Sequence, residues 1–234
     1  MCGRIIQTDF RKNYARKIGW DVSYAPAWVG GDSIPQYNIC PGAPIRIMDM
    51  RGSRPRVTDL RWGYCTPKEI EEKRKPWINA RIEKALTGRY FRHMFRSGRV
   101  IVPSEGWYEW TVENGKKQPW FITRIVDEPV FMAALTNWIE WNHYMPHQTV
   151  ETGVVIVTAD AEGGMVDVHD RRPVVLEPED ARIWMDPETP VEEAAHIAQA
   201  SSLPTEAFMW WRVDRAVNRY EQYKNGKHLL APIQ

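Results

Sequence analysis

The sequence lacks any apolar run long enough to cross a bilayer, and its first residues, Met1, Cys2, Gly3 and Arg4, do not resemble an apolar leader. A membrane-spanning helix needs about 20 mostly apolar residues, so we expect no membrane contact. The chain also lacks an excess of charge of one sign, with 31 basic and 30 acidic residues. This balance argues against polyanion binding over the whole surface and leaves only local sites. We therefore expect a soluble protein inside the cell.

Cysteines and familiar catalytic motifs are also scarce. The three cysteines, at positions 2, 40 and 65, cannot all pair, and no two of them form a C-x-x-C motif. Reduced thiols are the simplest interpretation. The sequence contains no G-x-x-x-x-G-K, no G-x-G-x-x-G after a strand, no G-x-S-x-G and no H-E-x-x-H. These absences argue against a nucleotide-binding protein, an α/β-hydrolase and a zinc protease, and we expect neither a metal nor a cofactor.

What the sequence does contain is a series of short strand patterns with a few helices among them. Helix patterns begin near 9, where Thr8 or Asp9 is expected to be the N-cap, and near 66, 81, 178 and 191. Residues 20–44 are predicted to form an irregular loop. Strand patterns cover 4–7, 45–50, 57–64, 100–102, 107–112, 120–125, 130–135, 153–158 and 208–213. Strands outnumber helices and mostly follow one another in pairs. The pattern therefore predicts an α+β fold with antiparallel sheets, in one domain spanning residues 1–234.

Cys2 is the first candidate for chemistry because of its position. If Met1 is removed, one residue carries both an α-amine and a thiol. An α-amine has a pKa near 8, so about a tenth of it is neutral at pH 7, and a neutral amine can form a Schiff base with an aldehyde. The thiol can then close onto the imine carbon to give a five-membered thiazolidine. The alternative is that Cys2 has no function and is merely the second residue of the chain. Its position alone favours this alternative.

Three further residues lie in stretches suited to catalysis. Glu109 stands between aromatic residues in a strand, where burial would raise its carboxyl pKa and suit it to proton transfer. His169 follows an apolar strand and is flanked by one acidic and two basic residues. Asn79 lies between apolar residues, and a buried amide needs partners. Each also has an ordinary interpretation: an ion-paired glutamate, a structural histidine and a structural asparagine.

Arginines and tryptophans could together form a local nucleic-acid site. Flat rings are surfaces on which unstacked bases rest, although most of the twelve tryptophans are expected to fill the core. The arginines of residues 89–99 could equally form a solvated helix face. Candidates for a phosphate-binding track are Arg4, Arg81, Arg89, Arg92, Arg96, Arg99, Arg171 and Arg172.

Taken in order, seven short stretches resemble the SRAP family of SOS response-associated peptidase-like proteins. The resemblance runs from residue 1 to about 220. No stretch is specific alone, but the ordered set is. The stretches are MCGR at 1–4, YNICPG at 37–42, WG at 62–63, INAR at 78–81, GWYEW at 106–110, KQP at 117–119 and VHDRRP at 168–173.

This resemblance implies one α+β domain with a barrel-like core flanked by helices. Family members bind single-stranded DNA and crosslink covalently to abasic sites, so the resemblance makes such DNA the partner. It implies that Cys2, after loss of Met1, attacks the ring-opened aldehyde of the abasic sugar, first as a Schiff base and then as a thiazolidine. Removal of its own Met1 is the peptidase activity that we expect. A monomeric, cytoplasmic protein of bacterial type, associated with DNA repair in the SOS response, is also expected.

The resemblance also assigns roles to the other candidates. Glu109 should be the general acid and base that opens the sugar, whereas the neighbouring Glu105 should not be the catalytic carboxylate. His169 should hold the deoxyribose oxygen and assist reversal, and Asn79 should orient Cys2. Phosphate contacts beside the lesion should come from Arg4, Arg81 and Arg171.

The chain departs from the family pattern in one stretch, and other functional classes remain open. Residues 66–75 are charged where members commonly carry a tryptophan, for which Trp77 is a possible substitute, and Lys84 replaces a common threonine. One alternative function is a cysteine peptidase or amidase with Cys2 as nucleophile and His169 as base. Another is a non-catalytic adaptor that binds single-stranded DNA reversibly through its aromatic and basic residues.

Overall fold

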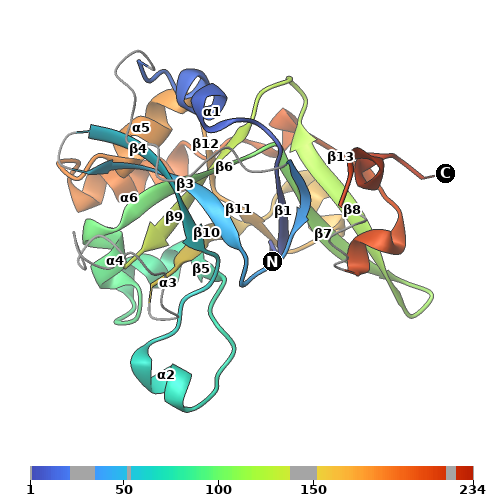
Figure 1. Ribbon diagram of the computed structural model, residues 1–234, viewed down its shortest axis with the longest axis horizontal. Coiled ribbons are helices and arrows are strands. Elements are labelled where there is room, and N and C mark those ends of the chain that lie inside the picture. The colour runs from blue at the N-terminus through green and yellow to red at the C-terminus, as the bar shows by residue number, and fades with distance from the viewer. Residues whose placement is uncertain (1, 22–34, 52–53, 138–151, 220–224, 234) are drawn as a thin grey trace.

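The computed structural model describes residues 2–21, 35–51, 54–137, 152–219 and 225–233. The described strands form two sheets. Figure 1 shows the five-stranded sheet on the side of the molecule where the C-terminus lies, and the eight-stranded sheet among the helices. The five-stranded sheet has the order β13 (Phe208–Arg212), β8 (Lys116–Arg124), β7 (Gly106–Glu113), β1 (Arg4–Gln7) and β2 (Gln36–Ile39).

The second sheet has eight strands, and one of its pairings was not predicted. Its main path is β11 (Arg171–Pro173), β10 (Val154–Asp160), β9 (Val130–Thr136), β6 (Arg99–Ser104), β3 (Pro44–Arg51) and β4 (Arg54–Arg61). Two further strands join it, β12 (Val175–Leu176) on β9 and β5 (Asn79–Arg81) on β10. Whereas the other pairs of named strands in the described part of this sheet are antiparallel, as the sequence predicted, the β5–β10 pair is parallel. A long crossover separates these strands in sequence, as a parallel pair requires.

The central strands of the eight-stranded sheet are buried on both faces. In β10, Val155 and Val157 belong to the apolar cluster that includes the helices, whereas Val154 and Ile156 belong to a second cluster that also contains Cys2. Alternate residues of a strand point to opposite faces, so a strand buried on both sides has a continuous apolar sequence. The Cys2 cluster includes residues of β1 and β7 as well, and it therefore joins the two sheets.

The described helices are α1 (Arg11–Lys17), α2 (Pro67–Glu71), α3 (Ile82–Thr87), α4 (Arg92–Ser97), α5 (Pro178–Met185) and α6 (Val191–Ala200). The helix expected to begin near residue 81 is in fact two, α3 and α4, with Gly88 at the end of the first. The start of α2 follows the sequence signal: Thr66 and Glu69 form a reciprocal capping box.

Two other local predictions were wrong because long-range partners decided them. Thr8 or Asp9 was expected to cap α1, but the N-cap is Phe10, without a side-chain cap. The Thr8 amide instead donates to Glu105 Oε2 at 2.8 Å. The expected loop 20–44 contains β2, which forms by pairing with β1, and includes the first residue of β3.

The fold is α+β, as the sequence predicted. The described strands do not close into a continuous barrel, but the two sheets with a shared apolar cluster are compatible with the barrel-like core that the resemblance implied. Within the described residues, no helix is long and apolar enough to span a bilayer.

Candidate functional site

Cys2 lies just before β1 and has no exposed surface. Its side chain belongs to the cluster between the sheets that also contains Trp62 and Trp107. Burial raises the pKa of the Cys2 thiol well above its usual value, and the nearby charge of Glu109 raises it further. At neutral pH the thiol is therefore protonated, and Cys2 is not a ready thiolate.

Asn79 reaches Cys2 because of the unpredicted parallel pairing. β5 lies along β10 with Asn79 opposite Ile156, and from there the Asn79 Nδ2 donates a hydrogen bond to the Cys2 carbonyl oxygen at 2.9 Å. The Asn79 Oδ1 is buried and has no hydrogen-bond partner within the described part of the chain. An unsatisfied buried amide oxygen costs about 1–3 kcal/mol, so this atom is suited to accept from a donor that enters the site.

Glu109 approaches Cys2 from the neighbouring strand. β1 pairs with β7 with Arg4 opposite Tyr108, and the same register continued by one residue brings Gly3 opposite Glu109. The Glu109 side chain is 2% exposed. Burial raises the pKa of its carboxyl to about 7, and the charge of Asp170 also acts to raise it. Both protonation states of Glu109 are therefore populated at neutral pH, as a proton-transfer group requires.

His169 is held by the backbone that follows it. The Arg171 amide N–H donates to His169 Nδ1 at 3.0 Å. Burial lowers the pKa of His169, so the neutral ring predominates at pH 7, with its proton on Nε2. Asp170 Oδ1 also lies 2.7 Å from Nδ1, and this exposed carboxylate can accept a proton from Nδ1 only when the ring is charged. Because an amide N–H is always a donor, Nδ1 is the acceptor in the neutral ring.

The three arginines expected to contact phosphates differ in their surroundings. Arg81 is exposed at the end of β5. Arg4 is half-buried and donates through NH1 to Asn38 Oδ1 at 2.6 Å and to the Val217 carbonyl at 2.7 Å. Arg171 is 5% exposed. Its guanidinium donates to Asp160, to Glu83 at 3.3 Å and to the Thr158 carbonyl at 2.7 Å. Arg81 is thus the one whose side chain faces solvent.

The neighbouring carboxylate, Glu105, has a structural position. It accepts hydrogen bonds from the Thr8 amide and from the Tyr14 hydroxyl, which attach the start of α1 to the strand region before β7. Of two other residues near the site, Asp170 was expected from the sequence as the acidic neighbour of His169, whereas Trp107 was not singled out. Asp170 acts on both Glu109 and His169, and Trp107 carries a buried indole N–H without a partner among the described residues. The effect of Asp170 on Glu109 and the position of Trp107 depend on strand pairing, for which the sequence offers no local signal.

The site therefore combines a buried Cys2, an amide that binds its backbone, a carboxyl that titrates near neutrality and a neutral imidazole. This set can exchange protons with a carbonyl compound bound at Cys2. Among the described residues, no group of three or more His, Cys, Asp or Glu side chains is arranged to hold a metal ion.

Comparisons with known proteins find similar sequences and a similar fold. Residues 1–220 match the family described as SOS response associated peptidase (SRAP). The chain is 38% identical over 239 residues to the abasic site processing protein YedK of Escherichia coli, with both chains covered completely. It is 28% identical to the abasic site processing protein HMCES of Xenopus tropicalis, covering 93% of this chain and 75% of that one. A crystal structure of a phage-related protein from Bordetella bronchiseptica is similar with a TM-score of 0.74 and 36% identity, covering 92% of this chain and 95% of that chain.

Proposed function

The chain belongs to the SRAP family, and from this premise we propose that it processes abasic sites in single-stranded DNA by forming a covalent crosslink through Cys2. The observation that carries the proposal is the convergence on Cys2 of two side chains from distant strands. Asn79 binds its carbonyl oxygen, and Glu109, with a pKa of about 7, interacts with its thiol. The names of the similar proteins support abasic DNA as the substrate.

The chemistry requires the α-amine of Cys2, which exists only after the bond between Met1 and Cys2 is hydrolysed. The neutral amine adds to the C1′ aldehyde of the ring-opened sugar to give a carbinolamine, which loses water to form a Schiff base. The thiol then adds to the imine carbon, its proton passes to the nitrogen, and a thiazolidine results. The aldehyde oxygen leaves as water, and no oxidant or cofactor is consumed.

Each of the other residues has a role in this sequence of steps. Glu109, in its protonated form, donates a proton when the sugar ring opens and when water leaves, and in its ionised form it accepts a proton from the amine. The neutral His169 donates through Nε2 to the deoxyribose oxygen and assists reversal. Asn79 orients Cys2 through its backbone, and its Oδ1 accepts from the amine.

The backbone of the DNA would be held by basic side chains around the site. The exposed Arg81 and the remaining N–H groups of the half-buried Arg4 are the proposed phosphate contacts. For Arg171, the bonds to Asp160, Glu83 and Thr158 support a positioning role, in which it holds the segment carrying His169 against β10 and α3.

The raised pKa of the Cys2 thiol argues for this mechanism over a cysteine peptidase. A cysteine protease uses a thiolate, which forms when nearby positive charge lowers the thiol pKa. Here burial and the Glu109 charge both raise the thiol pKa. An amine-first reaction does not need a thiolate to begin, because the thiol reacts only after the imine has formed.

The proposal is tested by incubating the purified protein with a single-stranded oligonucleotide that carries one abasic site. We expect an adduct that survives denaturing electrophoresis and whose mass equals protein without Met1 plus DNA minus one water. Cys2→Ala, which loses the thiol, should yield no thiazolidine, and any remaining Schiff base should be released by heating unless it is first reduced with borohydride.

Cys65→Ala is the matched control, because Cys65 is also a buried free cysteine but lies outside the site. It should crosslink as the wild type does. A stable adduct of normal yield with Cys2→Ala, or a protein without Met1 that forms no adduct at all, would contradict the proposal. Peptide hydrolysis that depends on Cys2 and is unaffected by abasic DNA would favour the peptidase instead.

A further inference from the structure

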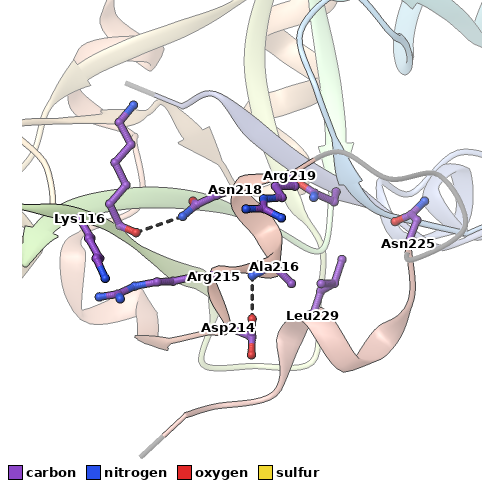
Figure 2. A pocket seen from close by; sticks show the side chains of 10 residues that line it. Lys116, Asp214, Arg215, Ala216, Asn218, Arg219, Asn225 and Leu229 are labelled. Atoms are coloured by element: carbon purple, nitrogen blue, oxygen red, sulfur yellow. Dashed lines mark hydrogen bonds between the residues drawn. The ribbon is translucent and has the colours of Figure 1, made fainter.

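A pocket outside the Cys2 site lies between the β7–β8 hairpin and the C-terminal segment. Its volume is about 590 Å³. Figure 2 shows Lys116 and Arg215 projecting at one end of the pocket and Arg219 beside Asn218. The lining residues come from β2, β8, the 3-10 helix η4 (Arg215–Asn218) and the residues around them: Asn38, Lys116, Lys117, Asp214, Arg215, Ala216, Asn218, Arg219, Asn225 and Leu229.

The pocket gathers positive charge in a chain that is nearly neutral overall. Four of its lining residues are basic and one, Asp214, is acidic, whereas the whole chain has a net charge of +1. Asp214 Oδ1 accepts from the Ala216 amide as the N-cap of η4. Within the described residues, none of the four basic side chains forms an ion pair with a carboxylate. Like charges held together without a counter-charge repel one another, and an anion relieves this repulsion.

The frame of the pocket is held by hydrogen bonds. Asn218 accepts from the Trp110 indole N–H at 2.7 Å and donates to the Lys117 carbonyl at 3.0 Å. Arg215 Nε donates to Gln118 Oε1 at 3.2 Å, and Gln118 in turn donates to the Val213 carbonyl at 2.8 Å. These bonds join η4 to β7 and β8, so the basic side chains project from a fixed backbone.

One of these bonds and two others connect the pocket to the strands that carry Glu109 and follow Cys2. Trp110, whose indole holds Asn218, directly follows Glu109 in β7. Arg4, two residues after Cys2, donates to Asn38 in the pocket lining and to the carbonyl of Val217 in η4. Glu109 and Trp110 are consecutive in β7 and therefore point to opposite faces of the five-stranded sheet. A DNA strand bound at Cys2 would thus reach the pocket by passing around the β2 edge of this sheet, where Asn38 lines the pocket.

We propose that this pocket binds a backbone phosphate of the same DNA strand, at a distance from the lesion. The inference rests on the proposed function for the choice of DNA as ligand, but not on the crosslinking chemistry. Lysine and arginine donate to phosphate oxygens with charge-assisted hydrogen bonds, and such contacts are independent of base sequence. The pocket thus adds affinity without adding sequence preference.

The test compares two double variants in binding to undamaged single-stranded oligonucleotides, which cannot crosslink. Lys117→Gln with Arg219→Gln removes two exposed charges from the pocket. Lys12→Gln with Arg16→Gln removes two exposed charges from α1, away from the pocket, as the matched control. Fluorescence anisotropy at several salt concentrations gives affinity and salt dependence. We expect the pocket variant to bind at least about fivefold more weakly, and the slope of log K against log salt to fall by about 0.7, the value for one phosphate on a single strand.

The length of the DNA provides a second measurement. For the wild type, affinity should rise in a step once the oligonucleotide is long enough to reach the pocket, and the pocket variant should lack this step. Equal affinities and slopes for the two variants would overturn the proposal. So would a pocket that binds inorganic pyrophosphate tightly while DNA affinity is unchanged in the variant, because it would then be a small-anion site.

A crosslinking assay distinguishes a failure of this proposal from a failure of the proposed function. At saturating abasic DNA the pocket variant should reach the same crosslink yield as the wild type, since its chemical groups are intact. If the wild type forms no crosslink, the proposed function fails, while the salt dependence on undamaged DNA still decides whether the pocket holds a phosphate. Circular dichroism should show equal thermal midpoints for both double variants, because all four side chains are exposed.

Discussion

At the scale of single residues, burial determines how the Cys2 site can react. The thiol of Cys2 and the carboxyl of Glu109 are both buried, and in both burial is the largest cause of a raised pKa. The thiol is therefore kept protonated, whereas the carboxyl is brought to a pKa at which it can both donate and accept at neutral pH. These two shifts are consistent with a reaction in which the amine attacks the aldehyde first and the thiol adds to the imine afterwards.

The raised pKa of Glu109 predicts a pH-dependent effect on stability. Its pKa in the folded protein is about 7, against 4.5 for an unperturbed glutamate, so the folded state binds more protons between these values and its stability falls as pH rises. Glu109→Gln removes this penalty. At pH 8 we expect the variant to be more stable than the wild type by about 1–3 kcal/mol, and at pH 4 the difference should vanish.

Urea unfolding at both pH values measures this difference. Glu188→Gln is the control, because Glu188 is exposed, and it should show no comparable change between the two pH values. A Glu109→Gln variant less stable than the wild type at pH 8 would show that ionised Glu109 is net stabilising.

At the scale of elements, the pairing of β7 with β8 places Glu109 and Trp110. Gly106 is the first residue of β7, and β8 passes very close to it. A Cβ at this position would lie 2.3 Å from the Ile122 carbonyl oxygen and 2.6 Å from the Phe121 ring. Neither a backbone carbonyl nor a buried ring can move away without disturbing the sheet. The absence of a side chain at residue 106 therefore allows β7, which carries Glu109, to pack this closely on β8.

Gly106→Ala should consequently destabilise the protein by about 2–4 kcal/mol, in the range of strong core disruptions. It should also slow crosslinking at temperatures where the variant remains folded, because β7 must shift. Gly115→Ala, in the turn between β7 and β8, is the comparison: its Cβ would meet nothing within 4 Å, although its φ of +71° adds about 1 kcal/mol of strain. Thermal unfolding and crosslinking time courses measure both effects, and equal behaviour of the two variants would exclude the close-packing explanation.

At the scale of the whole molecule, charge is local and limited. The chain has a net charge of +1. Arg171 is already paired with Asp160 and Glu83, which leaves Arg4, Arg81 and the basic pocket as the cations proposed to contact DNA. We expect the slope of log K against log salt for undamaged single-stranded DNA to lie between about −1.4 and −2.1, equivalent to two or three phosphates. A slope steeper than about −4 in a salt titration would show that many more cations contact the DNA.

The sequence alone determined the α+β class, most strand positions and the candidate residues, because alternation, capping signals and ordered motifs are local properties. The capping box of Thr66 and Glu69 and the motif around Glu109 could be predicted in this way. Only the tertiary structure decided which groups meet. The parallel pairing of β5 and β10 brings Asn79 to Cys2, 77 positions away, and burial between the sheets sets the pKa of Glu109. The basic pocket likewise exists because η4 packs on β8. Contacts between distant strands depend on long-range packing, which no local pattern records.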